Sequence, residues 1–229
     1  MTRQANINLM KRQRRSKDIG IEGMAALWYD NNTKKHRLAE MKAYAEEAAK
    51  HIQDGCSVLE VAPGPGHLAI EAAKLSDFEI IGLDIRKDFV EMAKRNASEV
   101  GVEVEFRQGS VADIPFPDDT FDFITCTAAF KNFKVPLEAL SQMYRVLKRG
   151  GTALIADMNR DASNQQIEDF TENMWTNGID KPFMKLIFKY FLRNAAYTKD
   201  EFVDLFSKTA FKEYRIKEEA IGFYIYLRK

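Results

Sequence analysis

Short apolar segments recur along the middle of the chain, separated by segments whose apolar residues follow helical spacing. The apolar segments, which we expect to be strands, are 57–62, 79–84, 102–107, 121–127 and 152–158. The expected helices are 34–52, 67–75, 87–100 and 136–147. Strands buried on both faces read as nearly continuous apolar runs, and connections this short join parallel strands through helices. The pattern therefore predicts an α/β fold built on a doubly wound, Rossmann-like sheet.

The regular alternation of strand and helix stops after residue 158. Residues 159–197 are rich in Phe and Met, and we expect them to form a helical insertion after strand five. Thr198 is expected to cap a helix that runs through Phe206. Two closing strands at 211–217 and 222–228 would complete a sheet of about seven strands, mostly parallel with an antiparallel C-terminal strand. Residues 1–33 are expected to be a partly helical N-terminal arm and cap segment, ahead of a main domain at 34–229.

Composition narrows the class of partner. Lys plus Arg and Asp plus Glu both total 34, so no overall charge favours nucleic acid or a membrane surface. A basic stretch between Arg3 and Lys17 is interpreted as a solvated terminus, with an anion-binding arm as the alternative. Two cysteines without metal-ligand spacing, no bilayer-length apolar run and no signal-peptide core favour a cytoplasmic protein without a bound metal.

The most informative motif lies between the first two strands. Gly64 and Gly66 stand in a turn that follows the first strand and opens a helix, and Asp84 ends the second strand. Glycine lets the backbone approach a ligand without a Cβ in the way. A carboxylate at the end of the second strand can accept hydrogen bonds from two ribose hydroxyls. This arrangement predicts a nucleoside-containing cofactor.

The neighbours of the glycine turn decide between cofactors. The string from Gly64 to Ala69 formally fits a dinucleotide fingerprint, and a turn that binds no ligand is a further alternative. Glu60, however, lies inside the first strand, where a carboxylate would repel a pyrophosphate but stabilise a cation. No cluster of basic side chains adjoins the loop to neutralise phosphates. S-adenosylmethionine fits better, because its sulfonium and ammonium groups favour Glu60 and its ribose favours Asp84.

Several segments together resemble a known family. They are Glu60 to Gly66, Leu83-Asp84-Ile85, Ile114 to Asp118 with Phe121-Asp122, Ala129 to Asn132, Tyr144 to Gly151 and Trp28-Tyr29-Asp30. In these segments the chain resembles the class I S-adenosylmethionine-dependent methyltransferases, and among them the ubiquinone/menaquinone biosynthesis C-methyltransferases. The resemblance implies a methyltransferase domain at 34–229, with 159–197 as a lid or insertion.

The resemblance also implies a set of cofactor-binding residues. They are Tyr29, Glu60, Ala62, Gly64, Gly66, Asp84, Ile85, Ser110, Val111 and Thr127. Glu60 and Asp84 would orient the cofactor, Ile85 would pack on the adenine, and Ser110 and Val111 would border it. Thr127 would face the methionine part, and the Tyr29 ring would cover the sulfonium unless it is simply core. At His67 the backbone N–H is expected to matter more than the ring.

Four positions depart from the family pattern, and one of them, Arg149 in place of a proline, is expected only to loosen a turn. Ala62 replaces the first glycine of the loop, which tolerates binding if its backbone angles are ordinary. Ser110 replaces an acid that commonly receives the adenine amino group. Lys131 replaces the arginine of an Arg-Asn pair, and it would contact an anionic substrate or be exposed. No general base is assigned, so the catalytic residues remain unknown.

The resemblance implies methyl transfer from S-adenosylmethionine to a small apolar or aromatic molecule, with S-adenosylhomocysteine as the product. The acceptor is expected between residues 20–33, the loop after strand four and the insertion. A helix at 180–193 has six apolar residues on one face: Phe183, Met184, Ile187, Phe188, Phe191 and Leu192. It is interpreted as a core helix, a lid over the acceptor, a homodimer surface or, least of all, a membrane-resting helix. The alternative functions are a non-catalytic binder of the same cofactor and a nicotinamide-dependent oxidoreductase.

Overall fold

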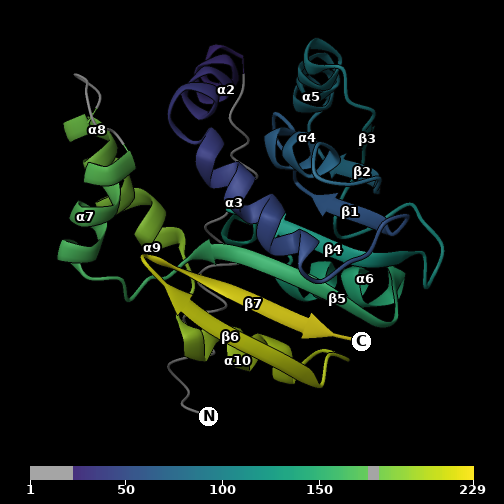
Figure 1. The fold of residues 1–229 in the computed structure, drawn as a ribbon. Helices are drawn as coiled ribbons and strands as arrows, with labels where there is room; N and C mark the ends of the chain where they lie inside the picture. The colour runs from purple at the N-terminus through teal and green to yellow at the C-terminus, as the bar shows by residue number, and fades with distance from the viewer. Residues whose placement is uncertain (1–22, 175–180) are drawn as a thin grey trace.

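The fold is a seven-stranded sheet between two layers of helices (Figure 1). A computed structural model describes residues 23–174 and 181–229, so the basic arm at 3–17 and residue 180 of the insertion lie outside the described residues. The strand order is β3-β2-β1-β4-β5-β7-β6. The strands are β1 (Ser57–Val61), β2 (Glu79–Asp84), β3 (Glu105–Gln108), β4 (Phe121–Thr127), β5 (Leu147–Met158), β6 (Glu213–Glu219) and β7 (Gly222–Arg228).

The strand directions place a crevice at the centre of the sheet. β1 pairs in parallel with β2 on one side and with β4 on the other, whereas β7 runs antiparallel to both β5 and β6. The chain therefore winds outward in both directions from β1 and β4. In open α/β sheets, ligands bind outside the carboxyl ends of the strands at such a switch point. The predicted doubly wound sheet with an antiparallel C-terminal strand is confirmed.

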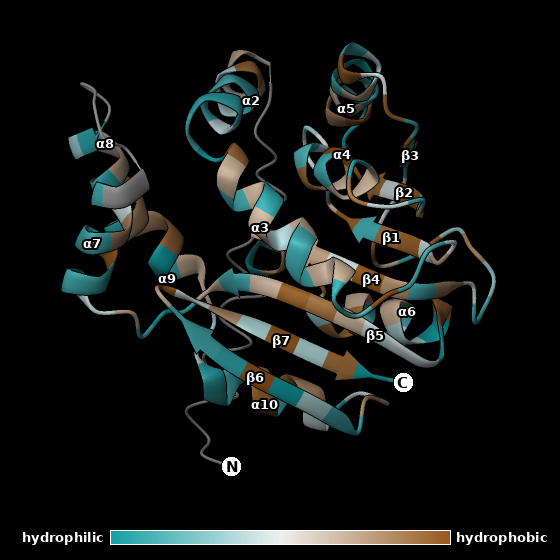
Figure 2. Cartoon of the chain, viewed as in Figure 1, coloured by the Kyte–Doolittle hydropathy of each residue, from teal (hydrophilic) through white to brown (hydrophobic). Residues whose placement is uncertain are grey.

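Alternating residues of each strand serve two separate cores. Val58 on β1 and Phe123 on β4 pack with α3 (Leu38–Ala49), α4 (His67–Ala73) and α5 (Lys87–Val100). Leu59 and Ile124, one position along, pack with α6 (Pro136–Val146) and α10 (Lys199–Ser207) on the other face. Figure 2 shows the hydrophobic residues concentrated in these inner strands and a hydrophilic edge at β6. The charged, exposed β6 protects the edge of the sheet from further pairing.

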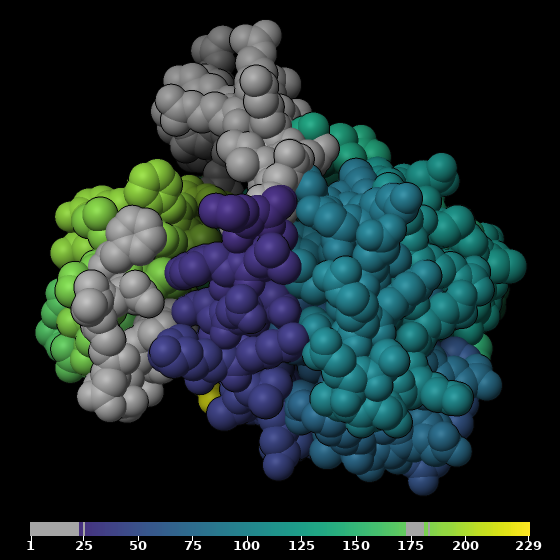
Figure 3. All heavy atoms as spheres, turned by 90° about the horizontal axis from the view of Figure 1, so that it is seen from above, coloured from purple at the N-terminus to yellow at the C-terminus, as the bar shows by residue number. Residues whose placement is uncertain are grey.

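The N-terminal helices differ most from the sequence pattern. Instead of one helix at 34–52, the chain forms α2 (Met24–His36) and α3, with Arg37 at φ −124° between them. The apolar spacing identified only α3, because α2 buries polar Asp30 and Thr33 beside Ala26. The domain boundary expected between residues 33 and 34 consequently falls inside a helix. Seen from above, α2 and α3 lie between the insertion and the α4–α5 side of the domain (Figure 3).

Two predicted strand boundaries were wrong. The strand expected at 102–107 pairs with β2 only from Glu105, and Val102 and Val104 pack on the core before it begins. β5 begins at Leu147 rather than at 152, with an irregular register opposite Phe121. The strand continues through Gly150 and Gly151. Gly151 passes so close to Asp122 on β4 that an added Cβ would lie 2.8 Å from the Asp122 carbonyl oxygen, so a glycine is needed there. The predicted cap of α10 is confirmed, since Thr198 and Glu201 form a reciprocal capping box.

The insertion after β5 is helical, as predicted. Its elements are α7 (Asn164–Met174), α8 (Lys181–Leu186), a π-helix η2 (Ile187–Leu192) and α9 (Arg193–Ala195). Met184 and Phe188 are buried in a separate small core with Met158, but Phe191 is 68% exposed. Phe191 was expected on the inner face because an α-helix repeats its face every three or four residues. A π-helix has a wider turn, so this spacing does not apply to Phe191. Among the helices of the described ranges, none is long and apolar enough to cross a membrane.

Candidate cofactor site

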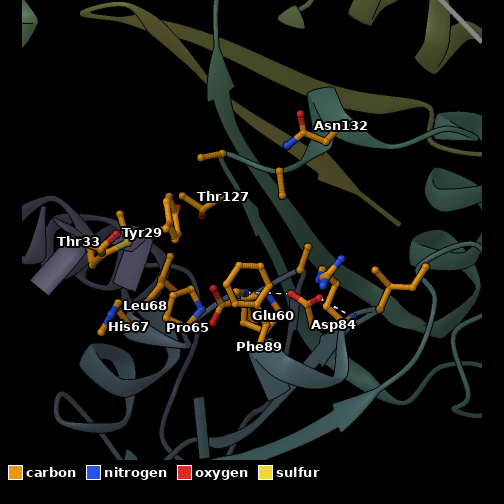
Figure 4. Close-up of a pocket in the computed structure, with 18 of the residues that line it drawn as sticks. Tyr29, Thr33, Glu60, Pro65, His67, Leu68, Asp84, Phe89, Thr127 and Asn132 are labelled. Carbon is orange, nitrogen blue, oxygen red and sulfur yellow. Dashed lines mark hydrogen bonds between the residues drawn. The ribbon is translucent and has the colours of Figure 1, made fainter. Parts of the chain in front are cut away.

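A cavity of about 200 Å³ lies at the carboxyl ends of the central strands, beneath α2 (Figure 4). Seven of the residues implied by the family resemblance line it. They are Tyr29, Glu60, Ala62, Gly64, Asp84, Ile85 and Thr127. They come from α2, from the ends of β1, β2 and β4, and from the turns that follow β1 and β2. The sheet thus brings together residues that are far apart in the sequence.

Asp84 is held rigidly at one end of this cavity. Its Oδ2 accepts a hydrogen bond from the Gly64 N–H at 3.0 Å, and its Oδ1 accepts one from the Arg86 N–H at 2.9 Å. The residue is buried, and this burial raises the pKa of its carboxyl. Both oxygens have spare acceptor capacity, since a carboxylate offers about four lone-pair sites. The carboxylate is therefore fixed in position and still able to accept hydrogen bonds from two hydroxyls.

Glu60 lies on β1 behind the glycine turn, with 3% of its surface exposed. One carboxylate oxygen accepts a hydrogen bond from the Ala69 N–H at 3.0 Å. Burial raises the pKa of Glu60, the hydrogen bond from Ala69 lowers it and the neighbouring charge of Asp84 raises it, with a net result of about 8. A cation in the cavity would favour the ionised form. Glu60 is thus suited to a positively charged ligand group.

The glycine turn depends on backbone conformations that glycine adopts easily. Gly64 has φ +56°, and Gly66 has φ +81° at the start of α4. Gly66 does not line the cavity; an added Cβ there would lie 2.7 Å from the Phe106 ring and 2.8 Å from Ala93. Ala62 also has φ +56°. Its backbone angles are therefore not ordinary, because the left-handed region costs an alanine about 1–2 kcal/mol.

Replacing Gly66 with alanine is expected to lower the free energy of unfolding by about 2–4 kcal/mol, because left-handed strain adds to overpacking against Phe106. Gly101→Ala is the matched control, since Gly101 has φ +71° but nothing within 4 Å of its added Cβ. This control should lose only about 1–2 kcal/mol. Urea denaturation of both variants measures the difference, and equal losses would contradict the role of close packing.

Ser110 and Val111 are not brought to the cavity wall. The Ser110 hydroxyl accepts a hydrogen bond from the Ala112 N–H at 3.2 Å, and Val111 packs against the hydrophobic core. The Ser110 side chain is therefore engaged in its own turn. Their assignment to the adenine remains a prediction.

The cavity-lining residues that the sequence analysis did not identify come chiefly from the N-terminal helices α2 and α3 and the residue between them. Thr33, Arg37 and Met41 line the cavity with Tyr29. These positions are four apart in sequence, so helical spacing counted from Tyr29 would have identified them. The Tyr29 ring packs edge to face with the ring of Phe89 on α5, at 6.4 Å between ring centroids.

A buried polar network holds α2 over the cavity. The His67 ring bonds Asp30 at 2.7 Å, and the Asn96 side chain donates to the same carboxylate at 2.9 Å. Lys34 joins both Asp30 and Asn96. The network links α2 to α4 and α5, so the His67 ring has a structural role in addition to its backbone N–H. Burial lowers the pKa of His67 despite the opposing influence of Asp30.

A second cavity of about 320 Å³ adjoins the first. Tyr29, Arg37, Ala128 and Asn132 line both cavities. One side of the second cavity is apolar, and its residues are Met158, Phe170, Phe188, Leu192, Ile221 and Phe223. It lies where the acceptor was expected, between α2–α3, the loop after β4 and the insertion. Phe188 and Leu192 form part of its wall, which favours the interpretation of the 180–193 segment as a lid over the acceptor.

Four charged groups of the second cavity form two ion pairs with each other, and the fifth, Glu219, pairs with Lys217 outside the cavity. Lys131 and Asp157 form an ion pair at 2.9 Å, with side chains 5% and 1% exposed. Lys131 also donates to the Ala128 carbonyl. Arg37 donates to both carboxylate oxygens of Glu40, at 2.8 and 3.1 Å. Lys131 is therefore neither exposed nor available as an uncompensated charge for an anion.

The residues of the first cavity fit a nucleoside with a cationic tail. Asp84 suits a ribose, the exposed Ile85 and buried Phe89 suit a flat base, and Glu60 suits a positive group. Two hydroxyls on the wall, from Thr33 and Thr127, are buried without a hydrogen-bond partner. In residues 23–174 and 181–229, no cluster of three or more His, Cys, Asp or Glu side chains is placed to hold a metal ion.

Comparison with known proteins agrees with this fit. A methyltransferase domain model matches residues 52–212. The uncharacterized methyltransferase YcgJ of Bacillus subtilis is 43% identical over 121 residues, which cover 52% of this chain and 46% of that protein. Demethylmenaquinone methyltransferase of Deinococcus radiodurans is 33% identical over 123 residues, covering 53% and 50%. The chain thus spans about half the length of these curated relatives.

Solved structures share the fold. A candidate S-adenosylmethionine-dependent methyltransferase from Methanococcus maripaludis superposes with a TM-score of 0.76 at 24% identity, covering 92% of this chain and 94% of that one. At this sequence identity, the structural similarity establishes only the fold. The family is established by the methyltransferase domain model that matches residues 52–212. The chain therefore belongs to the methyltransferase-domain family, among the class I S-adenosylmethionine-dependent methyltransferases related to the ubiquinone/menaquinone C-methyltransferases.

Proposed function

We propose that this protein transfers a methyl group from S-adenosylmethionine to a small, apolar or aromatic molecule. The observation that carries the proposal is the pair of buried carboxylates, Glu60 and Asp84, on one cavity beside the glycine turn. A dinucleotide would bring its pyrophosphate to this turn, where Glu60 would oppose it. A nucleoside with a sulfonium and an ammonium group gains from the same carboxylate. This difference favours a methyltransferase over a nicotinamide-dependent oxidoreductase.

S-adenosylmethionine, when bound, supplies a methyl group made electrophilic by its sulfonium. Asp84 would accept hydrogen bonds from the ribose, and Ile85 and Phe89 would pack on the adenine. Glu60 would stabilise the positive charge, with the Tyr29 ring over it. Gly64 would give the ligand access to the backbone. These residues bind and orient; none is proposed to break a bond.

The second cavity is the proposed acceptor site. Because it adjoins the first through Tyr29, Ala128 and Asn132, an acceptor there can lie in line with the methyl group. In-line displacement needs alignment and exclusion of water rather than a dedicated base, unless the acceptor must lose a proton. The apolar wall and the internally paired charges favour an uncharged acceptor. Relatives carry the name demethylmenaquinone methyltransferase, so a demethylated quinol is the first acceptor to test.

Titration calorimetry tests the cofactor assignment. We expect micromolar-range binding of S-adenosylmethionine and S-adenosylhomocysteine and no binding of NADH under the same conditions. Tight NADH binding would overturn the methyltransferase assignment. Transfer of a radiolabelled methyl group into a metabolite extract then separates an enzyme from a non-catalytic binder. A labelled product would support the methyltransferase hypothesis. Cofactor binding without any labelled product would support the hypothesis of a non-catalytic cofactor-binding protein.

Two further assignments remain proposals. Residues 34–229 form the proposed methyltransferase domain, with the insertion as a lid over the acceptor. A homodimer through the 180–193 helix is the other proposed use of the insertion, since Leu186 and Tyr190 are each about half exposed. Sedimentation velocity distinguishes a monomer from a dimer.

A further inference from the structure

Two hydroxyl groups on the wall of the first cavity have no hydrogen-bond partner. Within the described ranges, Thr33 Oγ1 and Thr127 Oγ1 are the buried side-chain nitrogen or oxygen atoms left without one, and both residues line this cavity. Thr33 is 2% exposed. Figure 4 shows Thr33 and Thr127 on the side of Glu60 away from Asp84. The two hydroxyls therefore belong to the end of the cavity opposite the proposed ribose position.

The Thr33 hydroxyl could have formed a hydrogen bond within its own helix. A helical threonine commonly donates to the carbonyl four residues earlier. Thr171, which is fully buried in α7, does this by donating to the Ile167 carbonyl at 2.8 Å. The Thr33 hydroxyl makes no such bond to Tyr29. A buried hydroxyl without a partner destabilises the fold, so native structures usually provide one from protein, water or ligand.

The charges around the two hydroxyls indicate which ligand group they suit. Glu60 is a buried carboxylate on the same cavity and suits an ammonium group. Arg37 lies four residues after Thr33 and adds a guanidinium to the wall. Its Nε and Nη2 groups pair with Glu40, and its Nη1 group lies outside that pair. An acid, a base and two hydroxyls together match a zwitterionic amino acid. Hydroxyl groups can donate to its carboxylate and accept from its ammonium.

We propose that Thr33, paired with Thr127, binds the amino-acid end of the cofactor. This inference rests on the proposed function, since it assumes a nucleoside at Asp84. It assigns a binding role to α2, an element outside the sheet. The ligand would bridge Thr33 on α2 and Thr127 at the end of β4, so its binding would also fasten α2 over the cavity.

The test compares two ligands that differ only at the amino-acid end. S-adenosylhomocysteine carries that end, whereas 5′-methylthioadenosine has the same nucleoside and sulfur without it. Thr33→Val, which keeps the shape of the side chain, should weaken S-adenosylhomocysteine binding about tenfold by calorimetry. Its affinity for 5′-methylthioadenosine should stay within about twofold of wild type, and Thr127→Val should behave in the same way.

The matched control is Thr171→Val, because it removes a buried threonine hydroxyl that is bonded to backbone and lies off the cavity. It should leave both affinities unchanged. Thr33→Val should also unfold at the same temperature as wild type or higher without ligand, since it removes an unpaired hydroxyl. Equal losses for both ligands, or none for S-adenosylhomocysteine, would overturn the inference. Absence of S-adenosylhomocysteine binding by wild type would instead reject the proposed function.

Discussion

Replacing Asp84 with alanine is expected to weaken binding of S-adenosylhomocysteine by about 100-fold or more. The change removes the proposed hydrogen bonds between a buried carboxylate and the ribose hydroxyls, and each bond to a charged group contributes about 1.5–3 kcal/mol. Since about 1.4 kcal/mol corresponds to a factor of ten, two such bonds exceed a 100-fold loss. Calorimetry measures the affinity, and circular dichroism checks that the fold is intact.

Two further variants isolate the role of the Asp84 carboxylate. Asp84 also accepts the Gly64 and Arg86 N–H groups, so alanine could loosen the glycine turn as well as remove the ribose contacts. Asp84→Asn keeps one acceptor oxygen and should lose less affinity than alanine. Asp88→Ala removes a carboxylate from the same segment that pairs with Arg86 and does not line the cavity, and it should bind normally. A normal affinity for Asp84→Ala would reject the ribose assignment.

Replacing Glu60 with glutamine is expected to change how stability depends on pH. The pKa of Glu60 is about 8 in the folded protein, against an ordinary value of 4.5. Between these values the folded state binds more protons than the unfolded chain. The contribution of Glu60 to the free energy of unfolding therefore falls as pH rises from 4.5 to 8, by roughly 1.4 kcal/mol per pH unit, and is constant above.

Glu60→Gln should lack this loss. The free energy of unfolding of the variant minus that of wild type should therefore increase from pH 5 to pH 8, as measured by urea denaturation at several pH values without ligand. Parallel curves for the two proteins would contradict the raised pKa.

Ligand binding gives a second measurement on the same variant. An ammonium group beside Glu60 favours the ionised carboxylate, so cofactor binding at pH 7 should release a proton in wild type. Calorimetry in buffers of different ionisation enthalpy detects this release. The proton release should diminish in Glu60→Gln, which should also bind more weakly. Proton release that is unchanged in the variant would assign it to another group, such as Asp84.

The sheet could be predicted because its sequence signals are local. Buried parallel strands such as β1 and β4 are short apolar runs, and the capping box at Thr198 is visible in four residues. The glycine turn and Asp84 were found for the same reason, since each lies directly at the end of a strand. The sequence could not predict that Ala62 adopts a left-handed conformation, because that depends on how the turn meets β2.

The parts that sequence reasoning missed depend on tertiary contacts. α2 faces the domain with Asp30 and Thr33, so hydrophobic periodicity did not detect it. The partner of Asp30 is His67, which follows much later in the chain. The position of α2 is thus specified by contacts between distant segments rather than by local preference. Phe191 was misplaced because a π-helix changes the number of residues per turn.

Four residues form a wall between the two cavities. Tyr29, Arg37, Ala128 and Asn132 each contribute to both. A ligand in either cavity would contact part of the surface that the other ligand contacts, so we expect their binding free energies to be coupled. Thermodynamic linkage requires that the acceptor change the affinity for S-adenosylhomocysteine by the same factor as S-adenosylhomocysteine changes the affinity for the acceptor. The acceptor can consequently be sought by its effect on cofactor affinity, before any methylated product is known.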